Sequence, residues 1–93
     1  MNENRKAVVT VIGIDRKGII ASVAKALYEN DANILDISQT VVSEYFNMVL
    51  VADVSSPECD FAQLADSLAK LGEEMGLQIR VQRSEIFEAM HQV

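Results

Sequence analysis

The sequence predicts an α+β fold in which a four-stranded antiparallel sheet carries two helices on one face. Two amphipathic helical patterns alternate with four short segments rich in Val, Ile and Leu, in the order strand, helix, strand, strand, helix, strand. The 93 residues suffice for one domain and are too few for two. We therefore expect a single domain over residues 1–93, with a core at about 5–85 and a short C-terminal helical tail at 86–93.

The first half of the chain predicts a central strand followed by a helix. Both alternating sets of side chains in residues 6–14 are largely apolar, as in a strand covered on two faces. After a break at residues 13–18, Ile19, Val23 and Leu27 follow at helical spacing and predict a helix of roughly three turns. Residues 30–33 then end the helix, because Asn and Asp tolerate turn geometry.

The middle of the chain predicts an antiparallel hairpin, because two strand patterns lie only a few residues apart. The first strand covers residues 34–42, with Leu35, Ile37 and Val41 expected on one face. The second begins near Phe46 and continues to residue 54.

Apolar residues at helical spacing between 61 and 75 predict the second helix. Asp60 with Gln63 resembles a capping box, and Ser56-Pro57 offers a competing start. Gly76 suits the residue after a helix, whereas Gly72 lies inside the pattern and costs about 1 kcal/mol there relative to Ala. Residues 77–81 predict the fourth strand.

This order of elements is that of a ferredoxin-like βαββαβ sandwich. Right-handed crossovers place the first and third strands in the centre and leave the second and fourth at the edges. An apolar edge strand needs a cover. The second strand and the tail, with its apolar Ile86, Phe87, Met90 and Val93, are therefore candidates for a homodimer contact.

Composition excludes several classes of function. With 14 acidic and 8 basic residues the net charge is −6, which disfavours nucleic-acid binding. One Cys and one His exclude an internal disulfide and a Cys/His zinc site. No run reaches the roughly 18 apolar residues of a membrane span. The apolar run before Asp15-Arg16-Lys17 ends too early for a signal peptide, so we expect a cytoplasmic protein without membrane partners.

No pattern predicts catalysis. The sequence has no Ser/His/Asp arrangement at a plausible spacing, no Walker loop and no dinucleotide fingerprint. We expect a protein that is not an enzyme, has no catalytic residue and binds no cofactor or metal.

The loop at residues 13–18 is the strongest candidate site. The helix that follows begins with free backbone N–H groups and a dipole that favours anions. Gly18 permits close approach of a ligand, and Arg16 and Lys17 add positive charge, so a small carboxylate is a plausible ligand. The alternative is that Gly18 permits a tight turn and Asp15 caps the helix. Asn33 either ends a turn or contacts a ligand.

Four segments carry a resemblance to a known family. Residues 11–20, 32–36, 37–41 and 45–48, in this order, resemble the ACT-domain family. They look most like the small stand-alone ACT-domain proteins of bacteria and archaea, which are related to the ACT modules of glycine-cleavage repressor-like proteins. The resemblance covers about residues 5–90.

The resemblance implies a non-enzymatic regulatory module that binds a small ligand, typically an amino acid, at a homodimer interface. By position, the ligand-binding residues of one copy are Gly13, Ile14, Asp15, Arg16, Lys17, Gly18, Ile19 and Ile20, and those of the partner copy are Asn33 and Ile34. ACT domains usually regulate an attached domain, which is absent from this sequence. The alternative is therefore a ligand-free adapter that docks on a metabolic enzyme or regulator, with a protein partner that the sequence does not identify.

Overall fold

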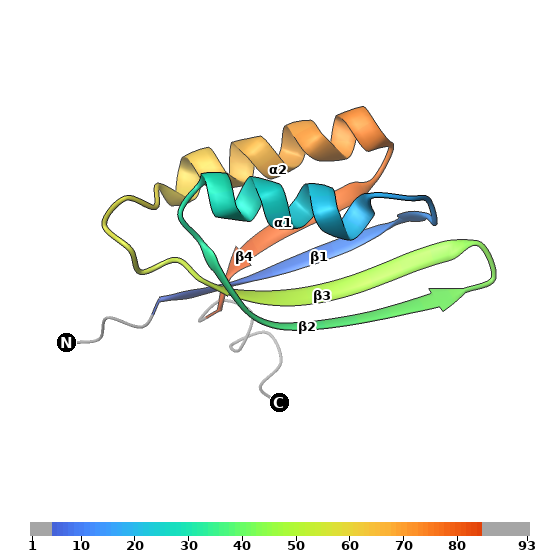
Figure 1. Ribbon diagram of the computed structural model, residues 1–93, viewed down its shortest axis with the longest axis horizontal. Coiled ribbons are helices and arrows are strands. Elements are labelled where there is room, and N and C mark those ends of the chain that lie inside the picture. The colour runs from blue at the N-terminus through green and yellow to red at the C-terminus, as the bar shows by residue number, and fades with distance from the viewer. Residues whose placement is uncertain (1–4, 85–93) are drawn as a thin grey trace.

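The computed structural model describes residues 5–84 and confirms the predicted fold class (Figure 1). The elements in chain order are β1 (Lys6–Ile14), α1 (Ile19–Glu29), β2 (Asn33–Val42), β3 (Tyr45–Asp53), α2 (Phe61–Met75) and β4 (Gln78–Arg83). The predicted tail at 86–93 lies outside the described residues. Within residues 5–84, no helix is both long and apolar enough to cross a membrane.

The four strands form one antiparallel sheet in the order β2-β3-β1-β4. β1 and β3 are central and β2 and β4 are the edges, as the right-handed crossovers predicted. In the register of the sheet, Val9 lies between Leu50 of β3 and Val81 of β4. Because β1 and β3 are antiparallel, the break after β1 at residues 15–18 and the turn that precedes β3 lie at the same end of the sheet.

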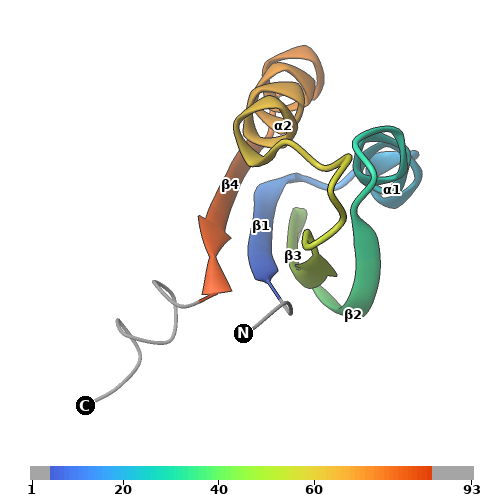
Figure 2. The same ribbon diagram turned by 90° about the vertical axis from the view of Figure 1, so that its left-hand side faces the viewer.

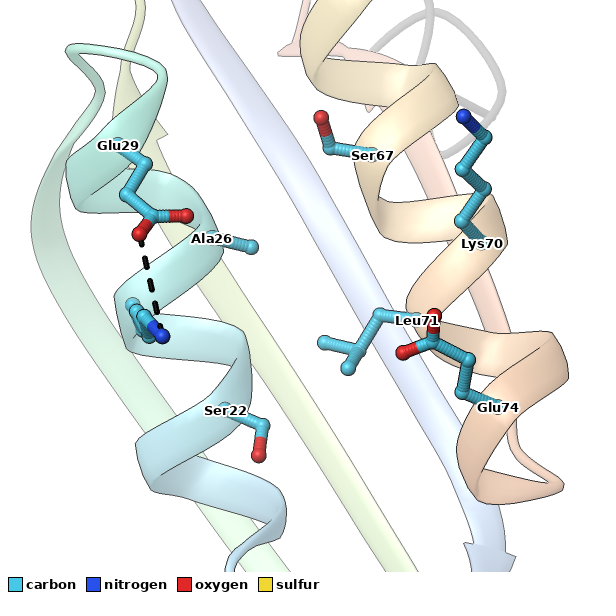
Figure 3. A pocket seen from close by; sticks show the side chains of 8 residues that line it. Ser22, Ala26, Glu29, Ser67, Lys70, Leu71 and Glu74 are labelled. Carbon is cyan, nitrogen blue, oxygen red and sulfur yellow. Dashed lines mark ion pairs between the residues drawn. The ribbon is translucent and has the colours of Figure 1, made fainter.

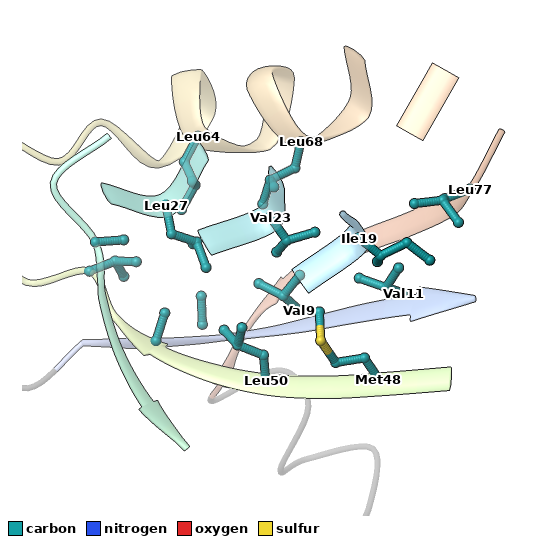
Figure 4. Packing of buried hydrophobic residues seen from close by; sticks show 14 of the residues in the cluster. Val9, Val11, Ile19, Val23, Leu27, Met48, Leu50, Leu64, Leu68 and Leu77 are labelled. Carbon is teal, nitrogen blue, oxygen red and sulfur yellow. The ribbon is translucent and has the colours of Figure 1, made fainter. Parts of the chain in front are cut away.

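The core lies between the two helices and one face of the sheet (Figures 2 and 4). Side chains that alternate along β1 and β3 meet the apolar stripes of α1 and α2 there. The largest fully buried members are Leu27, Met48, Leu50, Leu64, Leu68, Val9, Val11 and Val23. No described polar or charged residue is buried, so this layer is held mainly by apolar burial.

Local signals fix the ends of α2. Asp60 is the N-cap residue, and its carboxylate accepts hydrogen bonds from the N–H groups of Ala62 (3.0 Å) and Gln63 (3.3 Å). Gly76 ends the helix with a φ of 69°, which favours glycine. Of the two predicted starts, Asp60 is therefore the one used.

One detail of β2 differs from the sequence prediction. A β-bulge lies between Ile34, which pairs with Ala52, and Asp36, which pairs with Val51. Leu35 is the extra residue and has no partner on β3, so it does not continue the alternation of Ile37 and Val41. Ile34 instead shares the helix-covered face with these two residues, because its partner Ala52 is buried there.

Candidate functional site

A groove opens beside the start of α1. Its volume is about 320 Å³, and it is lined by the β1–α1 loop, the first turn of α1 and the adjoining ends of β2 and β3. The lining residues are Asp15, Arg16, Gly18, Ile19, Ile20, Ala21, Gln39, Val41 and Phe46. Val41 and Phe46 are direct partners across the β2–β3 ladder. The groove therefore has one polar wall at the helix start and one largely apolar wall on the sheet.

Gly18 is the N-cap residue of α1 and has a φ of 86°, in the left-handed region that favours glycine. No side chain in the described part of the chain caps this helix end, and the first turn contains no acidic residue. The first N–H groups of α1 therefore have no side-chain acceptor within residues 5–84, and the positive end of the helix dipole faces the groove. The alternative in which Asp15 caps the helix is wrong.

Two hydrogen bonds fix the loop between β1 and α1. The Asp15 N–H donates to the Glu44 carbonyl at 2.8 Å, which ties the loop to the turn between β2 and β3. The Arg16 guanidinium donates through Nη1 to the Met75 carbonyl in the last turn of α2, at 3.3 Å. The positive charge of Arg16 interacts favourably with the negative end of the α2 helix dipole. Both bonds leave the Asp15 carboxylate at the groove.

The structure brings together half of the residues that the sequence proposed. Asp15, Arg16, Gly18, Ile19 and Ile20 line the groove, whereas Gly13, Ile14, Lys17, Asn33 and Ile34 do not.

Three residues of this second group, Gly13, Ile14 and Asn33, have other surroundings. A Cβ at Gly13 would collide with the Leu77 side chain, so this glycine serves close packing of β1 against the start of β4. Asn33 pairs with Asp53, and Ile14 pairs with Tyr45, at opposite ends of β3. Asn33 is therefore separated from the groove of its own chain by most of the length of β2.

Four lining residues were not proposed from the sequence: Ala21, Gln39, Val41 and Phe46. Gln39 and Val41 lie two residues apart on one strand and therefore share a face. The sequence alone could therefore have indicated that Gln39 and Val41 lie on the same face of the sheet. The missing information was which face of β2 adjoins the start of α1, and the fold decides it.

A second hollow lies between α1 and α2 on the outer face of the helix layer, with a volume of about 360 Å³ (Figure 3). The lining residues on α1 are Ser22, Lys25, Ala26 and Glu29, and those on α2, with the same spacing, are Ser67, Lys70, Leu71 and Glu74. Lys25 and Glu29 form an exposed ion pair at 3.9 Å. Charged pairs on exposed helix faces are ordinary solvated surface, so the groove at the loop remains the stronger candidate.

A third hollow, at the other end of the sheet, contains the single cysteine. Cys59 lies with Phe61, Val54 and three basic residues, among which Arg83 stacks on the Phe61 ring at 5.2 Å from its centroid. Partial burial, and then nearby carboxylates, raise the pKa of the Cys59 thiol. A raised pKa opposes nucleophilic chemistry at neutral pH.

The comparisons with known proteins agree with the fold. A family model described as ACT domain matches residues 5–82. The UPF0237 protein of Methanocaldococcus jannaschii is 50% identical over 88 residues, which cover 95% of this chain and 98% of that protein. The chain therefore belongs to the ACT-domain family and has small relatives of its own length.

Comparison with solved structures also identifies the ACT-domain fold. An ACT domain protein from Streptococcus pneumoniae superimposes with a TM-score of 0.79 at 40% identity, over 95% of this chain and 99% of that chain. A glycine cleavage repressor-like protein has a TM-score of 0.78 at 23% identity, over 87% of this chain and 46% of that chain. The second likeness shows the fold alone.

Proposed function

We propose that this protein is a non-enzymatic regulatory ACT domain that binds a small amino acid or related carboxylate in the groove beside α1. The observation that carries the proposal is the uncapped start of α1. Its N–H groups face a groove, and the N-cap residue, Gly18, has no side chain to occupy the position of a ligand.

The remaining walls fit the other parts of an amino acid. The ligand carboxylate would accept hydrogen bonds from the first turn of α1. The Asp15 carboxylate would accept from the ligand ammonium group. Val41, Phe46 and Ile20 would contact an apolar ligand side chain. This arrangement favours a zwitterion over a simple anion, because it offers both an anion site and a carboxylate.

The proposal includes a homodimer formed through β2. This edge strand exposes apolar side chains on the described part of the chain: Ile37 is 40%, Val41 51% and Val42 60% exposed. Unpaired edges of this kind readily pair with another strand. If two copies of β2 pair antiparallel along their full length, Asn33 and Ile34 of one copy lie beside Val42 and Val41 of the other. The partner's Ile34, beside Val41 on the helix-covered face, would then complete the groove, whereas the partner's Asn33 would lie beside Val42 on the opposite face of the sheet.

Ligand screening tests the proposed binding. We expect one or a few of the twenty amino acids to raise the thermal midpoint, because a ligand at 100 times its Kd adds about 2.7 kcal/mol to stability. In a domain of this size that is a rise of roughly 10–20 °C. A flat response at millimolar concentrations would contradict the proposal and favour the adapter alternative.

Substitutions in the loop differ in whether they can test ligand binding at the groove. Gly18→Ala is uninformative, because the positive φ of Gly18 strains any alanine there, whether or not a ligand binds. Asp15→Asn keeps the size of the side chain and removes its charge. We expect it to weaken the ligand identified in the screen by about ten- to a hundredfold in calorimetry. Asp66→Asn, exposed on α2, is the matched control and should leave affinity unchanged.

Light scattering after size-exclusion chromatography tests the dimer. Ile37→Lys places a charge on the free edge and should give a monomer. Val49→Lys makes the same kind of change at an exposed strand residue away from that edge, and it should leave the dimer intact. Loss of the dimer in both variants, or in neither, would contradict assembly through β2.

A further inference from the structure

The wall that β2 gives the groove contains one polar residue in an otherwise apolar series. On the helix-covered face of β2 the side chains are those of Ile34, Ile37, Gln39 and Val41. Gln39 belongs to this face because its partner across the ladder, Met48, is buried in the core. A local break in a pattern that the rest of an element follows is expected at functional sites. Gln39 is therefore a candidate for a role in the groove.

The side-chain amide of Gln39 is available to a ligand. The residue is exposed and lines the groove. Its amide forms no hydrogen bond with any other residue in the range 5–84. A glutamine amide offers two N–H donors and one carbonyl acceptor, so both kinds of hydrogen bond can be made to a molecule in the groove.

Gln39 lies beyond the apolar part of the groove as seen from the loop. Asp15 is fixed beside the turn between β2 and β3, because its N–H donates to the Glu44 carbonyl. Val41 is close to that turn, and Gln39 lies two strand positions further from it, a distance of about 7 Å. An amino acid held by its carboxylate and ammonium groups at the start of α1 would extend its side chain past Val41 toward Gln39.

The charges of the groove lie away from Gln39. Among the described residues that line it, only Asp15 and Arg16 are charged, and both belong to the β1–α1 loop. A ligand side chain with a charged end would lose water at Gln39 without gaining an opposite charge. A wholly apolar side chain would leave the amide without a partner, which also costs free energy. A neutral polar end avoids both costs.

We infer that Gln39 selects an amino acid whose side chain ends in a neutral group that both donates and accepts hydrogen bonds, an amide or a hydroxyl. This inference rests on the proposed function, because it specifies the ligand of the same groove. Val41 and Phe46 would contact the carbon chain of this ligand, and Gln39 would bind its end group.

The proposed dimer would shield this contact from water. Consider two β2 strands that pair along their full length, with Leu35 as the extra residue in each. Ile37 of the partner subunit then lies beside Gln39 on the helix-covered face. A hydrogen bond under such a cover discriminates more strongly between ligands, because water cannot replace a missing partner.

Calorimetry on the complete protein with matched sets of amino acids tests the inference. One set is asparagine, aspartate and leucine, a second is glutamine, glutamate and methionine, and a third is threonine and valine. We expect the tightest ligand to be a neutral polar member, bound at least about fivefold more tightly than the others of its set, as one or two hydrogen bonds allow. The set that contains it distinguishes an amide from a hydroxyl.

Variants of Gln39 give the second readout. Gln39→Leu keeps the approximate size of the side chain and removes its hydrogen bonds. It should weaken the polar ligand at least about fivefold, while the apolar member of the same set binds equally well or better. Gln39→Glu adds a negative charge and should favour lysine over glutamine. Gln63→Leu, exposed on α2, is the matched control and should leave every affinity unchanged.

The outcomes separate this inference from the proposed function. Tightest binding of an apolar or a charged member would overturn the selection by Gln39 and leave the proposed ligand groove standing. Equal losses for all ligands in Gln39→Leu would do the same, because they indicate a structural role. Binding of no amino acid at all would contradict the proposed function itself, and this inference with it.

Discussion

Gly72 gives the sharpest test of the packing, because helix propensity and tertiary structure predict opposite signs for its replacement. Gly72 is buried on the inner side of α2, four residues before the helix ends at Gly76. Its carbonyl accepts the Leu77 N–H at 2.8 Å. The chain then turns so that the Leu77 carbonyl oxygen lies against the Gly72 backbone, and a Cβ added at Gly72 would meet this oxygen at 2.8 Å.

The magnitude follows from two opposing terms. Replacing a helical Gly by Ala gains about 1 kcal/mol of helix propensity. Overpacking a well-filled site costs about 1–3 kcal/mol, and the upper end applies here because the group in the way is backbone rather than a flexible side chain. We therefore expect Gly72→Ala to lower the free energy of unfolding by about 1–2 kcal/mol, and the thermal midpoint by roughly 4–16 °C.

Urea unfolding followed by circular dichroism measures this change. Ala69→Gly, at an exposed position of the same helix, is the control and should cost the ordinary propensity of about 1 kcal/mol. If Gly72→Ala instead stabilised the protein by about 1 kcal/mol, propensity would govern the position and the argument from close packing would be refuted.

Three further predictions follow from single residues. Asp60→Ala should destabilise the protein by about 0.5–2 kcal/mol in urea unfolding, because it removes the side-chain cap of α2; an unchanged midpoint would show that the cap contributes nothing. Hydrogen bonds from the Ser55 hydroxyl and N–H lower the pKa of Asp53, so its contribution to stability is present above the ordinary pKa of an unfolded Asp and is lost as pH falls through the folded value. Asp53→Asn should therefore flatten the acid side of the midpoint–pH curve, and a parallel curve would contradict this. The raised pKa of Cys59 should make its alkylation by iodoacetamide at pH 7.5 slower than that of an unstructured cysteine peptide, and an equal rate would contradict the burial of this thiol.

The sequence predicted the elements of this fold well because their signals are local. The stripe of Ile19, Val23 and Leu27, the Asp60 cap and the helix-ending Gly76 each act within one or two turns of chain. The order of strands then followed from the handedness of the crossovers. The loop at residues 13–18 was also identified locally, because a glycine directly before a helix marks a particular kind of helix start.

The structure refined the site where distant segments meet. Gln39, Val41 and Phe46 join the groove because β2 and β3 end beside the start of α1, a contact between segments about twenty residues apart. Asn33, which resemblance placed at the ligand, lies at the far end of β2 within its own chain. Pairing of two β2 strands would bring it to the same end of the sheet as the partner's groove, on the opposite face.

By itself, then, the sequence determined the helices, the strands, their order and the position of the loop between the first strand and the first helix; whether Asp15 caps that helix was left open. Those features depend on propensity, periodicity and capping between near neighbours. Tertiary structure alone decided the bulge at Leu35, the wall that β2 gives the groove and the close contact at Gly72. Each of these depends on which surfaces pack together, and side-chain spacing along one element does not encode the identity of its neighbour.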